Sequence, residues 1–145
     1  MLKGVPSILS PELLKILMEM GHGDELCIGD GNFPAAAYAQ RLVRLDGNAV
    51  PEILEAVLRF FPLDTFVKRP AALMKVVDRK AGEPPIWKEY EEIVRRYEAD
   101  AFGDGFDHVE RFAFYERAKQ AYAIVATSET ALYANIILKK GVVVE

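Results

Sequence analysis

Apolar positions along the chain follow two spacings, one typical of amphipathic helices and one typical of buried strands. Over residues 11–20 the apolar side chains return every three or four positions, which places Leu13, Leu14, Leu17 and Met18 on one face. We therefore predict a helix in this segment, with that face toward the core.

Both ends of this first helix are marked by its flanking residues. Ser10 is a preferred N-cap, and Pro11 suits the first helical position because its missing N–H is not needed there. Gly21 predicts a left-handed stop just after the helix.

The rest of the chain alternates between further helices and short apolar runs. Helices are predicted over residues 50–61, 84–100 and 111–121. Buried strands are predicted over residues 25–28, 41–45, 71–78, 122–127 and 135–144, with a glycine-containing loop over 102–110. This alternation predicts an α/β fold: a single three-layer domain over residues 1–145, with a mostly parallel or mixed sheet flanked by helices.

Composition narrows the class of protein. The chain has 145 residues, of which 51% are hydrophobic and 28% charged, so it can bury one full core. The net charge is −4 and the 18 basic residues are scattered, which leaves no basic surface for a phosphate backbone. We expect no nucleic-acid partner.

The single cysteine and the first residues bear on the compartment. Cys27 lies in an apolar run, which predicts a small buried side chain and no internal disulfide. Lys3, Glu12, Lys15 and Glu19 interrupt the apolar residues near the N-terminus. We expect neither a signal peptide nor a membrane span, and a cytoplasmic protein.

The stretch MGHGDELCIGDGNFP, at the end of the first predicted helix, concentrates residues that carry chemistry. Gly29 and Gly31 follow a predicted strand, as in the dinucleotide motif G-x-G-x-x-G, but Pro34 replaces the third glycine. A calcium loop that began at Asp30 would need a ligand residue at Pro34 and a glycine at Ala35. The spacing disfavours both a dinucleotide site and a metal site.

His22 is the residue of this stretch that turn formation does not explain. It lies between Gly21 and Gly23, which let a ligand approach the backbone closely. A histidine can give or take a proton near neutral pH, so His22 is either a general acid or base, or a turn histidine bonded to a helix-end carbonyl group. The spacing leaves both interpretations open. Asp30 follows the carboxyl end of the predicted strand, where open α/β sheets bind ligands.

Elsewhere the candidate residues give weaker signals. The chain contains no G-x-S-x-G or S-x-x-K sequence, which disfavours covalent catalysis. For His108, spacing alone favours a solvated loop residue, and Arg111 opens the predicted helix after it. Tyr133 and Asn135, at the entry to the last predicted strand, have side chains that can bond sugar hydroxyls.

Three longer segments carry the most specific pattern in the chain. They are LSPELLKILMEMGHGDEL, GDGNFPA and RFAFYERAKQAYAIVATSETALYANIILKKGV, in this order. Together they resemble the fucose mutarotase and ribose pyranase family, and RFAFYERA favours the fucose branch. The resemblance runs from Met1 to Val142 and is loosest between about Val50 and Asp107.

This resemblance implies an isomerase that interconverts the α and β anomers of L-fucose, or the pyranose and furanose forms of ribose, with no cofactor and no metal. It implies that His22 is the proton donor. The residues that it implies as substrate-binding are Asp30, Arg111, Tyr133, Ala134 and Asn135. It also implies a homo-oligomer, typically a decamer of two pentamers, with sites near subunit boundaries. With the resemblance, we interpret the strand after His22 as one that delivers Asp30 to the same pocket.

The residues are consistent with that chemistry, and two other classes remain as alternatives. Opening a cyclic sugar requires a proton to leave the anomeric hydroxyl while another reaches the ring oxygen, a task for acid–base groups and not for an electron carrier. The first alternative is a non-catalytic sugar-binding or regulatory module of a sugar operon. The second is a small nucleotide-binding domain.

Overall fold

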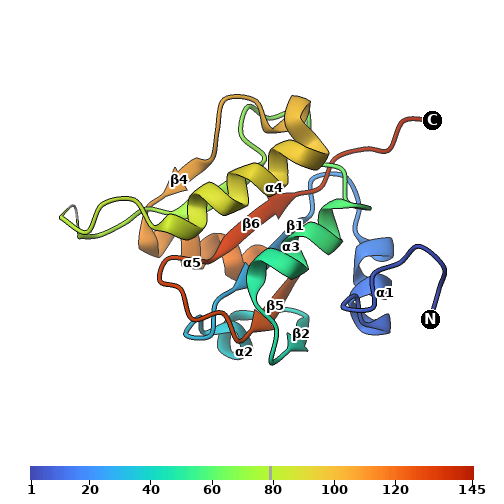
Figure 1. Cartoon of the computed structure of the whole chain (residues 1–145), viewed down its shortest axis with the longest axis horizontal. Helices are drawn as coiled ribbons and strands as arrows, with labels where there is room; N and C mark the ends of the chain where they lie inside the picture. Colours follow the sequence, from blue (N-terminus) through green and yellow to red (C-terminus); the bar gives the residue numbers. More distant parts are fainter. Residues whose placement is uncertain (79) are drawn as a thin grey trace.

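One mixed β-sheet, covered by helices on both faces, organises this computed structural model (Figure 1). The structure describes residues 1–78 and 80–145. The described strands are β1 (Glu25–Gly29), β2 (Leu42–Leu45), β3 (Ala71–Met74), β4 (Asp107–Val109), β5 (Ala123–Thr127) and β6 (Ile136–Lys139). The described helices are α1 (Pro11–Glu19), α2 (Ala35–Tyr38), α3 (Val50–Leu58), α4 (Pro85–Phe102) and α5 (Arg111–Gln120).

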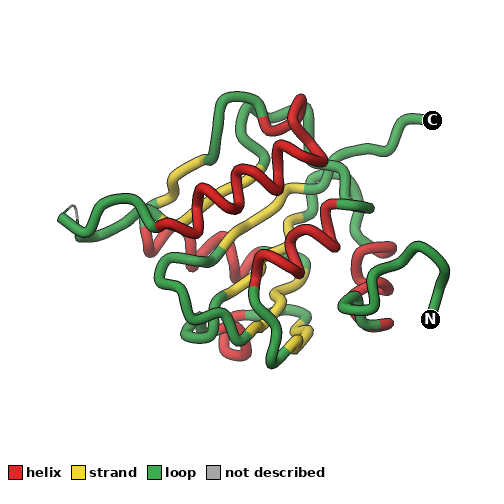
Figure 2. The backbone as a smooth tube through the Cα atoms, viewed as in Figure 1, coloured by secondary structure: helices red, strands yellow, loops and turns green. Residues whose placement is uncertain are grey.

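Nearly all strands of the sheet run in the same direction, so their carboxyl ends lie at one edge of the sheet and their amino ends at the opposite edge. The strand order is β2-β5-β1-β6-β3-β4 (Figure 2). β6 pairs antiparallel with β1 and β3, whereas the other described pairs are parallel. Strands β1 to β5 therefore end at one edge, where β6 begins, and we call it the carboxyl edge. The opposite edge, where β6 ends, is called the amino edge.

Alternation along the strands divides the core into two layers. In β1, Leu26 and Ile28 face the core formed with α1, α3 and α4, whereas Cys27 faces the smaller core formed with α2 and α5. In Figure 1, α3 and α4 cross in front of the sheet and α5 lies behind it. The predicted α/β class and its three layers are confirmed. Cys27 is fully buried, as expected, and burial raises the pKa of its thiol.

The first helix confirms one end signal and corrects the other. The Ser10 hydroxyl accepts a hydrogen bond from the Leu13 N–H at 3.1 Å, as an N-cap does. Gly21 is not the left-handed residue; Gly23, with φ of 88°, has that conformation. Met18 is 85% exposed and not part of the core, because the buried face of the helix lies around Ile16 instead.

Three segment predictions were wrong in extent. The predicted strand 71–78 ends at Met74, and the predicted strand 135–144 ends at Lys139. The predicted loop 102–110 contains β4, a three-residue strand that pairs with β3 at the border of the sheet. Apolar runs outside the sheet lack a partner strand, and a three-residue strand is too short to give an alternating pattern. Among the described helices, none has the length and hydropathy needed to cross a membrane.

Candidate active site

The carboxyl edge brings together four of the six predicted site residues. Asp30 directly follows β1, and residues 133–135 directly precede β6. Because β1 and β6 are antiparallel neighbours, these two segments meet, and the Asn135 side-chain oxygen accepts the Asp30 N–H at 2.7 Å. Tyr133 and Ala134 lie on the same short segment.

Asp30 is a buried carboxyl group whose surroundings partly offset the cost of its charge. Burial raises its pKa above the ordinary value, and the nearby carboxylate of Glu129 acts in the same direction. The backbone N–H groups of Asn32, Ala134 and Phe33 oppose this rise through hydrogen bonds to Asp30, and the Asn32 bond measures 2.9 Å. The net result is a raised pKa and a carboxyl group that can accept hydrogen bonds from a ligand.

The segment 133–135 has an unusual backbone that other parts of the chain support. Tyr133 has φ of 54°, in the left-handed region that non-glycine residues rarely occupy. Its hydroxyl accepts the Val77 N–H at 3.2 Å, and its carbonyl accepts the indole N–H of Trp87 at 2.7 Å. The Tyr90 hydroxyl donates to the next carbonyl, that of Ala134, also at 2.7 Å.

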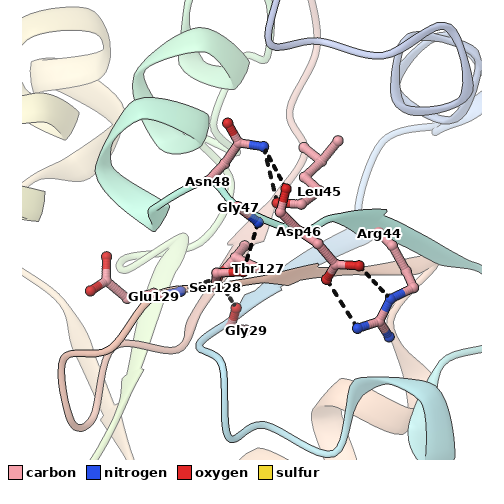
Figure 3. Close-up of polar contacts among 9 residues, drawn as sticks. All are labelled: Gly29, Arg44, Leu45, Asp46, Gly47, Asn48, Thr127, Ser128 and Glu129. Carbon is pink, nitrogen blue, oxygen red and sulfur yellow. Dashed lines mark hydrogen bonds and ion pairs between the residues drawn. The ribbon is translucent and has the colours of Figure 1, made fainter.

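A second network joins the ends of β1, β2 and β5 beneath this segment (Figure 3). The Thr127 hydroxyl donates to the Gly29 carbonyl at 2.8 Å and accepts the Glu129 N–H at 3.1 Å. The Ser128 hydroxyl accepts the Gly47 N–H at 2.7 Å, which ties the turn after β2 to the turn after β5. The carboxyl edge is thus held by polar bonds between turns that are far apart in the sequence.

Glu129 is a buried member of this edge that the sequence analysis missed. One carboxylate oxygen accepts the Val50 N–H at the start of α3, at 3.1 Å, and the other accepts the Ala131 N–H at 3.0 Å. These bonds fix the 128–135 turn against a helix N-terminus, where negative charge is favoured. The residue could not be found from the sequence, because one of its two partners, Val50, lies 79 positions away.

Arg111 lies at the carboxyl edge but apart from the Asp30 group. It opens α5 directly after β4, which is three strands from β1, or about 14 Å in the plane of the sheet. The side chain is exposed, and its guanidinium carbon lies 4.7 Å from the centroid of the Phe112 ring.

His22 lies at the amino edge, so the expectation that it shares one pocket with Asp30 is wrong within a single chain. It precedes β1, and the adjoining Gly23 N–H donates to the carbonyl of Lys140, just beyond the end of β6. From Glu25 to Asp30 the strand rises by about 16 Å. The sheet separates the two residues.

A buried aspartate holds the His22 ring. Asp64 Oδ1 lies 3.0 Å from His22 Nε2 and also accepts the Phe66 N–H at 3.0 Å. Burial alone would raise the pKa of Asp64, but the Phe66 N–H, the His22 ring and Lys139 lower it overall. Since a carboxylate only accepts hydrogen bonds, Nε2 carries the proton and Nδ1 is the ring nitrogen left for a ligand.

No sequence motif indicates this Asp64–His22 pair. The two residues are 42 positions apart, and they meet because the Asp64 N–H donates to the Lys139 carbonyl beside β1. The histidine is not bonded to a helix-end carbonyl group, so the turn-residue alternative does not describe it. Its side chain is 44% exposed, and the ring centroid lies 5.1 Å from that of Phe66.

The other histidine has a different setting from the one expected. His108 lies in β4 and not in a loop, and its ring centroid is 5.1 Å from that of Trp87. It is exposed, and no hydrogen bond joins it to the Asp30 group among the described residues.

A cavity of about 740 Å³ borders the Asp30 group on the side of α3 and α4. Tyr133 and Glu129 contribute to its wall, which is otherwise mostly apolar and includes neither Asp30 nor Asn135. A sugar needs partners for several hydroxyl groups, so we place the candidate site at the polar group and not in this cavity. Within residues 1–78 and 80–145, no three histidine, cysteine or acidic side chains converge as metal ligands.

Comparison with known proteins gives consistent matches over nearly the full length. The model of the RbsD / FucU transport protein family matches residues 3–143. The fucose mutarotase of Homo sapiens is 53% identical over 147 residues, which cover 97% of this chain and 94% of that protein.

Two solved structures also match. A fucose mutarotase from Streptococcus pneumoniae, in complex with L-fucose, superposes with a TM-score of 0.89 at 48% identity, covering 99% of this chain and 100% of that one. FucU from Bifidobacterium longum has a TM-score of 0.92 at 50% identity, covering 98% and 100%.

Proposed function

We propose, from the premise that the chain belongs to the RbsD / FucU transport protein family, that it interconverts the α and β anomers of L-fucose. The observation that carries this proposal is the 48% identity, over 99% of the chain, to a fucose mutarotase solved with L-fucose. Residues 1–145 act as one mutarotase domain. The free, buried Cys27 favours a reducing compartment, and we place the reaction in the cytoplasm.

The chemistry requires groups that hold hydroxyls and groups that move protons. At the carboxyl edge, Asp30 accepts from sugar hydroxyls, and the Tyr133 hydroxyl and Asn135 amide orient the ring. Ala134 takes part in sugar binding through its backbone groups. Arg111, at the start of α5 on the same edge, is the proposed donor to the sugar's oxygens.

His22 is the proposed proton donor. The ring oxygen must gain a proton as the anomeric hydroxyl loses one, and a histidine can exchange protons near neutral pH. With Nε2–H bonded to Asp64, Nδ1 is the atom that takes and returns the proton. Asp64 fixes this tautomer and the orientation of the ring.

Two copies of the chain complete the site. His22 lies about 16 Å or more from Asp30 in one chain, so the His22 that serves a given Asp30 comes from a neighbouring subunit. Exposed apolar side chains support contact at both edges: Phe66, 78% exposed, stands beside His22, and Leu132 and Phe112 are exposed at the carboxyl edge.

This contact also favours a ring. An interface between opposite edges of two identical copies is head-to-tail, and such contacts form a ring where the rotation between copies closes. We propose a homo-oligomeric ring, with two pentamers stacked as a decamer and each site at a subunit boundary.

Saturation-transfer NMR on the anomeric protons of L-fucose tests the proposed reaction. We expect excess α–β exchange with the wild-type protein, above the uncatalysed rate in the same buffer. D-ribose, followed through its pyranose and furanose signals, is the matched second substrate. Binding of L-fucose by calorimetry without excess exchange would instead identify a non-catalytic sugar-binding module and sink the mutarotase proposal.

A further inference from the structure

Two side chains of α4 contact the segment that carries Tyr133 and Asn135. Trp87 and Tyr90 lie three positions apart on the buried face of the helix. They donate hydrogen bonds to two successive carbonyl groups, those of Tyr133 and Ala134, both at 2.7 Å. A pair of donors spaced by nearly one helical turn thus matches a pair of adjacent acceptors.

The segment needs such support because of its conformation and its burial. A tyrosine with φ of 54° persists only where the surrounding structure holds it. Ala134 is fully buried, so water cannot replace the Tyr90 hydroxyl as the partner of its carbonyl. Loss of either donor frees the backbone to relax toward an ordinary conformation.

The position of this backbone sets the position of several sugar partners. The Ala134 N–H and the Asn135 side chain both bond to Asp30, and the Tyr133 side chain projects from the same three residues. We propose that Trp87 and Tyr90 are positioning residues for sugar binding: they hold residues 133–135 in the conformation that aligns Tyr133 and Asn135 with Asp30. The inference rests on the proposed function, which it deepens.

Tyr90→Phe is the decisive variant, because it removes one hydroxyl and keeps the ring in the core. We expect the KM for L-fucose to rise about tenfold, since a buried hydrogen bond is lost, with kcat within about twofold. Tyr97→Phe is the matched control: it lies on the same helix and also loses a tyrosine hydrogen bond, to Glu55 at 3.0 Å, but far from the segment. Its KM should equal that of the wild type.

A double-mutant cycle distinguishes positioning from general destabilisation. If Tyr90 acts through the segment, the fold-increase in KM of the double variant Tyr90→Phe/Tyr133→Phe is smaller than the product of the two single fold-increases. Multiplicative effects would overturn the proposal. Trp87→Phe, which keeps an aromatic ring and loses the indole N–H, should raise KM in the same direction.

One signal tests the same contact without any sugar. Trp87 is the only tryptophan of the chain, so its indole N–H gives a single resonance. Tyr90→Phe should shift this resonance and speed its exchange with solvent, whereas Tyr97→Phe should leave it in place. An unchanged resonance together with an unchanged KM overturns the positioning role. Absence of excess exchange in the wild type would instead count against the proposed function, and the resonance would still show whether Tyr90 maintains the contact of Trp87 with residues 133–135.

Discussion

The two edges of the sheet each bury one aspartate beside a candidate site residue, and their pKa values move in opposite directions. Burial raises the pKa of Asp30 at the carboxyl edge, despite the backbone N–H groups around it. At the amino edge, burial also acts on Asp64, but the Phe66 N–H, the His22 ring and Lys139 outweigh it and lower the pKa. Asp64 Oδ1 is bonded to both the His22 ring and the Phe66 N–H, whereas for Asp30 the effect of burial on the pKa exceeds that of its backbone partners.

This difference indicates what each edge is built to do. A carboxyl group whose charge is only partly offset is available to bonds from a ligand, at a cost to the stability of the fold. A carboxylate satisfied by a histidine and a backbone N–H serves to hold that histidine. In the proposed function the carboxyl edge is the binding surface and the amino edge carries the proton donor, and the predictions below test this division.

The largest effect is expected at His22. His22→Ala removes the proposed proton donor, and we expect the excess α–β exchange rate to fall by about 10²- to 10⁴-fold. The side chain is 44% exposed in the single chain, so the fold should be unchanged by circular dichroism, and light scattering checks that the loss of rate is not a loss of the oligomer. The control is His108→Ala, which removes the only other histidine and should keep the wild-type rate. Full activity in His22→Ala would exclude His22 as the acid.

A smaller effect is expected from the partner of His22. Asp64→Asn leaves a neutral amide beside the ring, which no longer fixes the tautomer, and kcat should fall about tenfold. Because Asp64 does not touch the sugar in this division of roles, the KM for L-fucose should remain within about twofold. A rise in KM with unchanged kcat would assign Asp64 to the binding surface instead.

The smallest effect is expected on the free energy of unfolding, for which the two aspartates can be compared directly. A raised pKa means that Asp30 loses stabilising free energy as pH rises through its pKa, so Asp30→Asn should be more stable than wild type at pH 7. A lowered pKa means that Asp64 stabilises the fold above its ordinary pKa and loses this as pH falls through the folded value. Asp64→Asn should therefore be less stable than wild type at pH 7.

Urea denaturation at pH 7 and pH 3 measures both differences. Each should shrink toward acid pH: the difference for Asp30 as pH falls toward the ordinary pKa of the unfolded chain, and the difference for Asp64 as pH falls further, toward its lowered folded pKa. If the two variants changed the free energy of unfolding in the same direction, the contrast between the edges would be removed.

The elements of the fold were largely predictable because their signals are local. Ser10 and Pro11 mark the start of α1 within two residues, and alternation around Cys27 places β1 between two helical layers. The strand β4 was not predictable, since its three residues form a strand only through pairing with β3. Gly23, not Gly21, takes the left-handed turn, a choice that depends on its bond to Lys140.

The candidate site was predictable only in part, because most of its contacts join segments that are far apart in the sequence. Asp30 and residues 133–135 were assigned through the family resemblance, and their meeting follows from the antiparallel pairing of β1 and β6. Asp64, Glu129 and Trp87 carry no local motif, because their partners lie in segments far along the chain. The extended strand β1 separates His22 from Asp30. Spacing in the sequence could not indicate that a second subunit would be needed to bring the two residues together, as we propose.

Activity in mixed oligomers tests most directly whether the two edges of different copies form one site. His22→Ala and Asp30→Asn are each expected to be nearly inactive when assayed well below the wild-type KM for L-fucose. Co-expressed in equal amounts, the two variants should regain about one quarter of the wild-type exchange rate, because one boundary in four then joins an intact His22 to an intact Asp30. A mixture no more active than its two parents would contradict the shared site and place both roles within one chain.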